Sequence, residues 1–257
     1  MKLLFIGDIV GRPGRDAVCE RVPEIIKEFS IDCCIANAEN AAGGSGITPK
    51  VADHLLSSGV DLLTSGDHIW RNSEIFQLID RTDKVIRPAN FLTTVPGRGS
   101  TVIKLRSGVQ IGVINLLGRV FMNPIENPFQ AVMREIESIK KQTSVILVDV
   151  HAEATSEKIA MGWYLDGVVS AVVGTHTHVP TADNKVLPNG TAYITDVGMV
   201  GARYSVLGRD VHAVLKHFTT GLPARFTVAE GDIVLHSVII DIDEHTGKAR
   251  DIIRLER

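Results

Sequence analysis

The sequence predicts an α/β fold with a mixed β-sheet. Short apolar runs, the first at residues 3–6, alternate with longer segments of helical periodicity. Later in the chain the pattern changes to two strands, 101–105 and 110–115, which are joined through Ser107-Gly108 as a hairpin turn. Strand–helix–strand units give parallel pairs and a hairpin gives an antiparallel pair, so the sheet is expected to be mixed.

The first hundred residues contain three apolar runs that are short enough to be buried strands. These expected strands are 3–6, 33–36 and 60–64. The sequence also predicts a helix at about 16–29, a helix capped by Thr48 that ends near Ser57, and a short helix capped by Ser73. Pro23 is expected to kink or split the first helix, because proline removes a helix hydrogen bond.

The remainder of the chain continues this alternation and then becomes richer in strands. The expected elements are a helix at 128–141, a strand at 145–148, a helix capped by Thr155 or Ser156, and a strand at 168–173. From about Asn184 onward, alternating segments, notably 233–242, predict further strands, with one helix near 210–218. No linker or repeat interrupts the pattern, so we expect residues 1–257 to form a single domain.

The composition argues against several classes of protein. The net charge is −3, and the basic residues are scattered among acidic ones, which argues against binding of duplex nucleic acid. The first apolar run is too short for a signal sequence, and no later run is long enough to cross a membrane. The three cysteines are odd in number, and two are adjacent in an apolar run, as is typical of buried thiols. We therefore expect a cytoplasmic protein without a membrane partner.

Polar side chains follow five of the predicted strands at their carboxyl ends. They are Asp8, Glu39, Asp67, His68, His151, His176 and His178. In open α/β sheets the carboxyl ends of the strands line the ligand crevice, so we expect these side chains to converge. Carboxylate and imidazole ligands without thiolates favour manganese, iron, zinc or cobalt, and the set predicts a dinuclear metal site. Each residue alone could be a cap, a solvated charge or a core histidine. A Ser-His-Asp triad is an alternative, but no Gly-x-Ser-x-Gly turn is present.

The segment Gly174-Thr175-His176-Thr177-His178 carries two of these histidines. In an extended chain His176 and His178 would point to the same side, with Cα atoms about 7 Å apart. They could then bind one metal ion together or one ion each. Two surface loop histidines are the alternative interpretation.

Several runs of the sequence resemble the motifs of a known family. The ordered motifs of calcineurin-like metallophosphoesterases are matched by Gly7-Asp8, Glu39-Asn40, Gly66-Asp67-His68, His151 and the segment 174–178. More narrowly, the runs 87–91, 151–158 and 195–199 make the chain similar to the YmdB-type bacterial phosphodiesterases. The resemblance implies a sandwich of two mixed β-sheets flanked by helices. It also implies hydrolysis of 2′,3′-cyclic nucleotides, typically cyclic AMP, by a cytoplasmic homo-oligomer.

The resemblance further implies a role for each matched residue. Asp8 and His178, with Asn40 as a helper, would bind a first metal ion. Asp67, His151 and His176 would bind a second ion, and Glu39 would bridge the two. The ions would be iron or manganese, with zinc or cobalt as alternatives. His68 resembles the histidine that donates a proton or stabilises charge beside the phosphate.

Two positions depart from the pattern of the wider superfamily. Val10 stands where a histidine is usual, and Asp67 stands where an asparagine is usual. They motivate an alternative function, a regulatory metal-binding protein with weak residual phosphoesterase activity. An RNA phosphodiesterase is a third hypothesis, which the absence of a basic groove disfavours.

The main hypothesis is that a hydroxide held by the two ions attacks phosphorus in line, while His68 and the ions stabilise the developing negative charge. A nearby acid would protonate the departing ribose oxygen. The loops 116–122 and 43–46 are candidates for contact with the nucleoside, and ordinary connections between elements are the alternative.

Overall fold

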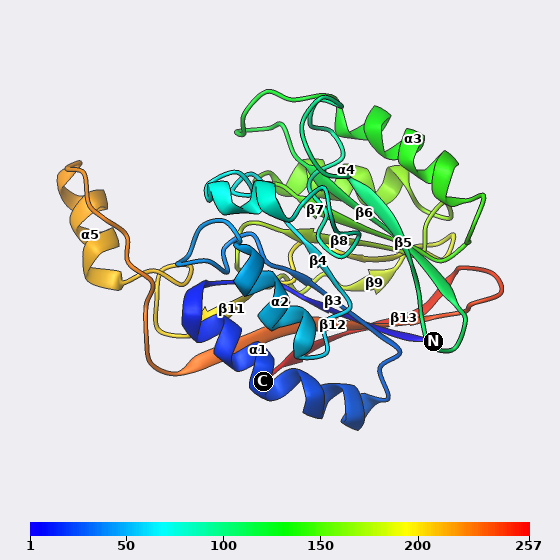
Figure 1. Cartoon of the computed structure of the whole chain (residues 1–257), viewed down its shortest axis with the longest axis horizontal. Helices are drawn as coiled ribbons and strands as arrows, with labels where there is room; N and C mark the ends of the chain where they lie inside the picture. The colour runs from blue at the N-terminus through cyan, green and yellow to red at the C-terminus, as the bar shows by residue number, and fades with distance from the viewer.

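Two mixed β-sheets face each other in the computed structural model, which describes all 257 residues (Figure 1). The strands of the first sheet lie in the order β2-β11-β12-β1-β3-β4, with β13 paired to β12. Their bounds are β1 Lys2–Ile6, β2 Asp8–Ile9, β3 Cys33–Asn37, β4 Leu62–Thr64, β11 Met199–Ala202, β12 Ile233–Ile242 and β13 Ala249–Glu256. Strands β1, β3 and β4 are parallel, so their carboxyl ends lie at the same edge.

The second sheet has the order β5-β6-β7-β8-β10-β9. Its strands are β5 Ser100–Lys104, β6 Gln110–Leu117, β7 Ile146–His151, β8 Ala171–Thr175, β9 Lys185–Val186 and β10 Ala192–Ile194. The expected hairpin is confirmed, since β5 and β6 are antiparallel, whereas β6, β7, β8 and β10 are parallel. The predicted α/β sandwich of two mixed sheets flanked by helices is therefore confirmed.

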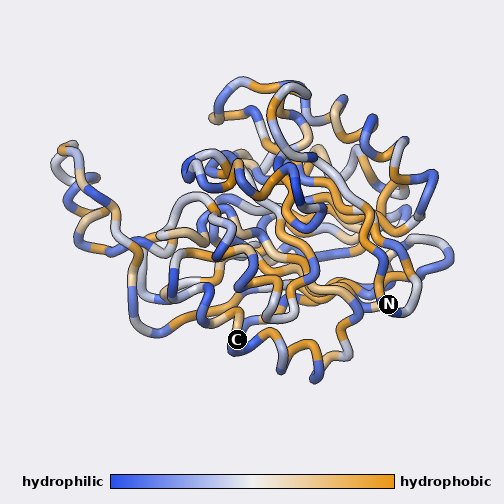
Figure 2. The backbone as a smooth tube through the Cα atoms, in the orientation of Figure 1, coloured by the Kyte–Doolittle hydropathy of each residue, from blue (hydrophilic) through white to orange (hydrophobic).

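Alternate residues of each central strand enter different apolar cores. In β1, Leu3 and Phe5 point between the two sheets, where they meet residues of the second sheet such as Val173. Leu4 and Ile6 point outward into the core beneath two helices. A strand buried on both faces must be apolar at every position, which explains the continuous apolar runs. Figure 2 shows these apolar positions along the central strands.

The helices cover the outer faces of the sandwich. α1 (Gly11–Phe29) and α2 (Pro49–Ser57) pack on the first sheet, and α3 (Pro128–Ile139) and α4 (Thr155–Tyr164) pack on the second (Figure 1). A short 3₁₀ helix, η1 (Ser73–Gln77), follows β4, and α5 (Val211–Thr220) projects away from the body. No helix combines the length and the apolar character that crossing a membrane would require.

The expected start and break of the first helix are wrong. α1 begins at Gly11, directly after β2, and runs without a break through Pro23 to Phe29. Its face with Val18 and Val22 is buried against the first sheet, while Pro23 is exposed on the opposite face. Packing of an apolar face contributes more to helix stability than local propensity does, so one exposed proline does not divide this helix.

One of the three predicted helix caps is confirmed. The Thr48 hydroxyl accepts a hydrogen bond from the Val51 amide at 3.2 Å. At η1, Asn72 rather than Ser73 is the cap, since its side chain accepts from the Glu74 amide. α4 has no side-chain cap, because Thr155 and Ser156 both lie inside the helix and Ala154 precedes it.

Gly174 provides a test of how closely β8 packs against α4 and against the residue that follows β10, the neighbouring strand of the same sheet. An added Cβ at this position of β8 would overlap the carbonyl oxygen of Thr195 and lie 2.7 Å from Cδ of Lys158. We expect Gly174→Ala to lower the free energy of unfolding by about 1–3 kcal/mol, because overpacking forces backbone shifts. Gly201→Ala in β11 is the matched control, since the nearest atom to its added Cβ is 3.4 Å away. Urea unfolding of both variants measures the effect, and equal free energies would contradict the packing argument.

Candidate metal centre

The structure brings all eight predicted site residues to one end of the sandwich. Asp8, Glu39, Asn40, Asp67 and His68 follow strands β1, β3 and β4 of the first sheet, while His151, His176 and His178 end or follow strands β7 and β8 of the second. The site therefore spans the carboxyl ends of two facing sheets. The convergence at strand carboxyl ends was predicted from the sequence, and the surrounding architecture is the sandwich of two sheets that the family resemblance implied.

Four of these residues form a compact set, called here the His151 group. Glu39, Asp67, His151 and His176 each offer one ligand atom, and these atoms all lie within 4.8 Å of one another. The His151 Nε2 atom is 3.1 Å from Glu39 Oε2 and 3.4 Å from Asp67 Oδ1. The His176 Nδ1 atom is 3.0 Å from the same His151 nitrogen. Two oxygens and two nitrogens thus face a common centre.

Asp8, Asn40 and His178 form a second set, called the His178 group. His178 Nε2 lies 3.7 Å from Asp8 Oδ1 and 3.2 Å from Asn40 Nδ2. Asn40 Nδ2 also donates to Glu39 Oε1 at 2.8 Å. The two carboxylate oxygens of Glu39 therefore face different groups. The Asn40 amide oxygen, the atom that would bind a metal ion, lies 2.9 Å from His68 Nδ1 instead.

Each group contains a buried carboxylate oxygen that has no hydrogen-bond partner. These atoms are Oδ1 of Asp8 and Oδ1 of Asp67. A buried anionic oxygen without a partner is costly, so such atoms usually coordinate a cation. Each of the two oxygens also faces a histidine nitrogen, and the ligands are all oxygen and nitrogen, as iron, manganese, zinc and cobalt accept. The residues therefore fit metal ions.

The two carboxyl groups of the His151 group, those of Glu39 and Asp67, are ionised at neutral pH and can therefore bind a cation. Burial alone would raise the pKa values of Glu39 and Asp67, but the adjacent His151 reverses this effect. The pKa of Glu39 is held well below its ordinary value, and that of Asp67 is also lowered. Burial and the neighbouring His151 lower the pKa of His176 to about 4, so that His176 is a neutral donor.

The extended conformation expected for His176 and His178 is wrong. Both have positive φ values, 96° for His176 and 64° for His178. The strand ends at Thr175 because the following amides leave the sheet: His176 N donates to Asp8 Oδ2 and Thr177 N donates to Asp196 Oδ2. The turn directs the two imidazoles to different groups. Each such residue costs about 1–3 kcal/mol in backbone strain and needs support from its surroundings.

A buried ion pair supports this strained turn. Lys158 Nζ donates to Asp196 Oδ2 at 2.7 Å and to the Thr175 carbonyl oxygen at 2.7 Å. The same carboxylate oxygen of Asp196 accepts from the Thr177 hydroxyl at 2.6 Å. Neither residue was predicted to belong to the site, although both lie in runs that carry the family resemblance, 151–158 and 195–199. A signal was present for Asp196, which follows the apolar strand β10 as the other site residues follow their strands.

Hydrogen bonds on the far side of the two imidazoles of the His151 group set which nitrogen faces the centre. Thr175 Oγ1 donates to Asp149 Oδ1 at 2.8 Å and lies 2.9 Å from His151 Nδ1, which leaves His151 Nε2 facing the carboxylates. Burial raises the pKa of Asp149 to about 6. On His176, Nε2 lies 3.1 Å from Glu153 Oε2, which leaves Nδ1 facing the centre beside His151 Nε2. Carboxylates and hydroxyls behind ligating histidines commonly fix the ring in this way.

His68 is held at the edge of the centre. Its Nδ1 lies 2.9 Å from Asn40 Oδ1, and its amide donates to Glu39 Oε2 at 3.2 Å. Hydrogen bonding to Glu39 raises the pKa of His68, which favours the protonated ring. The side chain is 26% exposed, and Nε2 is 3.7 Å from Asp67 Oδ2. His68 can therefore reach a molecule bound from solvent.

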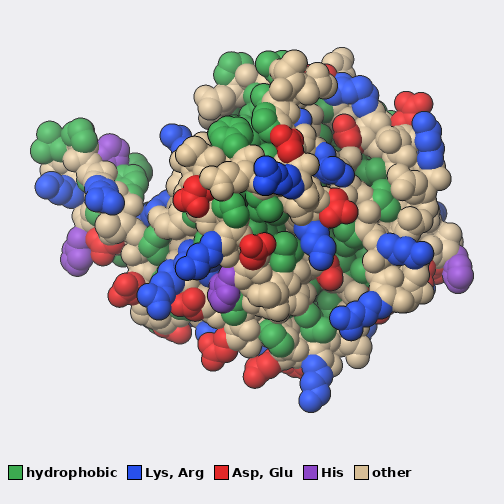
Figure 3. Space-filling view, in the orientation of Figure 1, with side chains coloured by type: hydrophobic (Ala, Val, Ile, Leu, Met, Phe, Trp, Pro, Cys, Tyr) green, Lys and Arg blue, Asp and Glu red, His purple; other side chains and the backbone are tan.

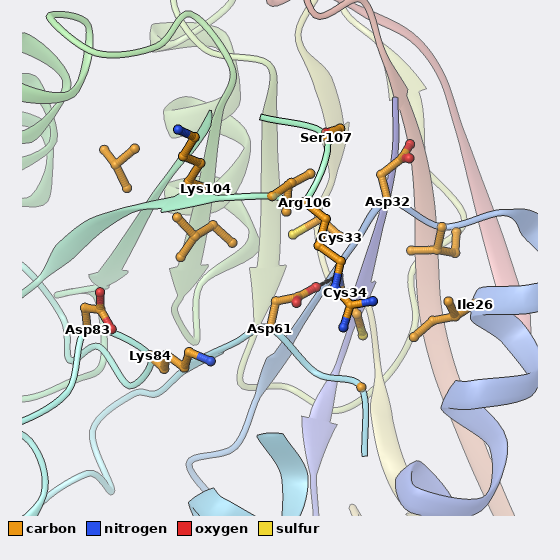
Figure 4. Close-up of a pocket in the computed structure, with 15 residues that line it drawn as sticks. Ile26, Asp32, Cys33, Cys34, Asp61, Asp83, Lys84, Lys104, Arg106 and Ser107 are labelled. Carbon is orange, nitrogen blue, oxygen red and sulfur yellow. Dashed lines mark hydrogen bonds between the residues drawn. The ribbon is translucent and has the colours of Figure 1, made fainter. Parts of the chain in front are cut away.

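Cavity size alone does not locate this centre. A cavity of about 720 Å³ lies at the amino ends of β3 and β4 and is lined by residues such as Cys34, Asp61, Lys84 and Lys104 (Figure 4). None of the eight predicted site residues lines it. A smaller cavity of about 390 Å³ is lined by the loop from Arg119 onward, whose start is tied to β7 by a bond from Gly118 N to His151 O.

The chain is similar to known proteins over nearly its whole length. Residues 4–255 match the family model described as YmdB-like protein. The chain is 52% identical over 255 residues to the 2′,3′-cyclic-nucleotide 2′-phosphodiesterase of Bacillus subtilis strain 168, covering 99% of this chain and 96% of that protein.

Two solved structures share the fold. A hypothetical protein from Thermus thermophilus superposes with a TM-score of 0.94 at 40% identity, covering 100% of this chain and 99% of that one. A novel phosphatase from Mycoplasma pneumoniae superposes with a TM-score of 0.93 at 33% identity, covering 100% and 93%.

The protonation of His151 predicts how pH affects metal binding. Burial disfavours a charged imidazole, but Glu39, Asp67 and Asp8 together raise the pKa of His151 well above its ordinary value. In the metal-free protein at pH 7 an ion entering the His151 group must therefore displace one proton. We expect the apparent affinity to rise about tenfold per pH unit below that pKa.

Titration calorimetry at pH 7 in buffers with different ionisation enthalpies measures the number of protons released. About one proton per ion is expected for the wild type, since His176, the other imidazole of this group, is already neutral. Release of no proton by the wild type would show that His151 is already neutral.

Proposed function

Because the chain belongs to the YmdB-like family, we propose that it is a metal-dependent phosphodiesterase that hydrolyses 2′,3′-cyclic nucleotides, with 2′,3′-cyclic AMP as the expected substrate. The relative from Bacillus subtilis is named for this activity. The observation that carries the proposal is the position of Glu39, whose two oxygens face two separate sets of metal-binding side chains.

The two groups would hold one ion each. In this proposal Asp8 and His178, with Asn40 beside them, bind the first ion, and Asp67, His151 and His176 bind the second. Glu39 bridges the pair. The unpartnered oxygens of Asp8 and Asp67, one in each group, support two ions rather than one. The ligand atoms suit iron or manganese, with zinc or cobalt as alternatives.

The ions, when bound, would polarise the phosphoryl oxygens and lower the pKa of a coordinated water to about 7. The role of the protein is to place His68 against the reacting phosphate. His68 Nδ1 donates to Asn40 Oδ1, and hydrogen bonding to Glu39 raises the pKa of the ring, so the protonated ring carries a second proton on Nε2. There it would stabilise charge on phosphorus-bound oxygens, or protonate O2′ as the P–O2′ bond breaks and a 3′-nucleotide forms.

The loop after β6 is the proposed nucleoside contact. The Glu157 carboxylate accepts hydrogen bonds from the Arg119 and Val120 amides, which fixes the loop beside His151. Phe121 of this loop is 89% exposed. An exposed aromatic ring next to a phosphate site can stack on a base. The glycine-rich loop 43–46, on the side of the His178 group, is a second candidate.

The proposal also covers the domain organisation, the location and the partners of the protein. We propose that residues 1–257 form one domain, and that the protein is a cytoplasmic homo-oligomer without a duplex nucleic acid or membrane partner. The core between the sheets supports the single domain, since Phe5 of one sheet and Val173 of the other are buried in it. Separation of the two sheets would expose this apolar surface.

Turnover of 2′,3′-cyclic AMP by the metal-loaded protein tests the proposal. We expect formation of 3′-AMP by the wild type and only the background rate with Glu39→Gln, because a neutral amide bridges two cations poorly. Metal content should fall, while the circular dichroism spectrum should not change. A panel containing 3′,5′-cyclic AMP measures specificity. A wild-type rate no higher than that of Glu39→Gln would contradict the enzymatic function.

His68→Ala separates catalysis from metal binding. We expect an unchanged metal content and a rate lower by about 10²-fold or more, which is the usual effect of losing an acid or charge stabiliser. His245→Ala, in an exposed turn away from the centre, is the control and should keep the wild-type rate. If His68→Ala loses metal, His68 is a ligand and the assigned role is wrong.

A further inference from the structure

Residues 210–227 form an arm that projects from the body of the molecule (Figure 1). The arm consists of α5 and the segment that returns along it, with the Phe226 ring 5.5 Å from the His217 ring. At its base, Asp210 N donates to Thr227 O at 3.0 Å. Every hydrogen bond made by residues 211–226 has both of its partners within the arm. The body therefore provides little support for the helix.

The arm helix has an apolar stripe without a cover. Val211, Val214, Leu215 and Phe218 occur at the spacing of one helix face. Val214 is the one buried residue of α5, while Leu215 is 51% and Phe218 is 76% exposed. Figure 3 shows hydrophobic side chains gathered at the end of the arm. An isolated helix of ten residues is marginal in water, so its stability needs a packing partner.

We propose that the stripe packs against the arm of a second copy of this chain about a two-fold axis. Leu215 and Phe218 of the stripe, with Leu222 and Phe226 of the returning segment, expose roughly 450 Å² of apolar surface if each side chain has about 200 Å², a typical area for a large aromatic side chain. A stable dimer needs about 800 Å² from each partner. Four side chains thus supply more than half of it, and the remaining arm surface can supply the rest.

A second copy fits this surface better than an unrelated partner. The stripe must be covered whenever the chain is folded, and another copy of the chain is always present in equal amount. A two-fold pairing places the same apolar stripe on both sides, so each arm is complementary to the other. The inference rests on the homo-oligomer of the proposed function and identifies its contact surface.

The segment that leads into the arm, residues 207–209, connects this interface to the candidate metal centre. The Leu207 carbonyl oxygen lies 3.1 Å from Nδ1 of His178, so this hydrogen bond leaves His178 Nε2 facing Asp8. Nearby, the Arg209 guanidinium donates to the Gly44 carbonyl oxygen. Pairing of the arms would hold this segment in place and would thereby support the orientation of His178.

Sedimentation velocity tests the surface with three proteins. The wild type should assemble, Leu215→Glu/Phe218→Glu should sediment as a monomer, and Trp163→Glu should behave as the wild type. Trp163 is the matched control, since it is an apolar residue that is 55% exposed on α4. An assembly that survives the double substitution would overturn the arm surface but leave the homo-oligomer intact. A monomeric wild type would overturn both, whereas the proposed hydrolysis is tested separately, by turnover of 2′,3′-cyclic AMP.

Cross-linking provides an independent test of the two-fold contact. Cys33 and Cys34 are buried, so a Cys19→Ser background removes the remaining accessible thiol. In that background, Phe218→Cys should give a covalent dimer with a short bismaleimide, and Trp163→Cys should not. Absence of a dimer for Phe218→Cys, or equal yields at the two positions, would overturn the proposed pairing.

Discussion

Buried carboxylates with too few protein partners are the constraint on which the rest of this molecule depends. Asp8 and Glu39 are almost fully buried, and one oxygen of Asp8 and one of Asp67 lack hydrogen bonds. Nearby histidines offset part of the negative charge only when they are protonated. A cation satisfies the same oxygens without that requirement, so these residues fit metal ions better than they fit one another.

The sandwich supplies the rigidity that such a centre needs. Asp67 follows a strand of one sheet and His151 ends a strand of the other, so the distance between them is set by the core that joins the sheets. The Lys158–Asp196 pair then holds the turn that carries His176 and His178. Loss of either partner of that pair would leave a buried charge without compensation.

Sequence reasoning succeeded where the chemistry follows from position along a strand. An apolar run that ends in a polar residue, such as the run before Asp8, indicates both a buried strand and a side chain at its carboxyl end. Parallel pairing then brings such residues together, which is why their convergence could be predicted. The roles assigned to individual ligands came from family resemblance, and these roles remain predictions.

The features that the sequence did not reveal depend on contacts between distant segments. The positive φ of His176 is maintained by Asp8 and Asp196, which lie far from it in the chain. The unbroken helix through Pro23 depends on packing against the first sheet. Similarly, periodicity predicts a helix near residues 210–218 but not that its apolar face lies outside the core.

Anomalous diffraction from crystals of protein purified without chelator tests the central claim most directly, because it locates metal ions and identifies them by their absorption edges. We expect two peaks, one beside Asp67, His151 and His176 and the other beside Asp8 and His178, with Glu39 between them. A single peak, or peaks that Glu39 does not contact, would contradict a dinuclear centre bridged by Glu39.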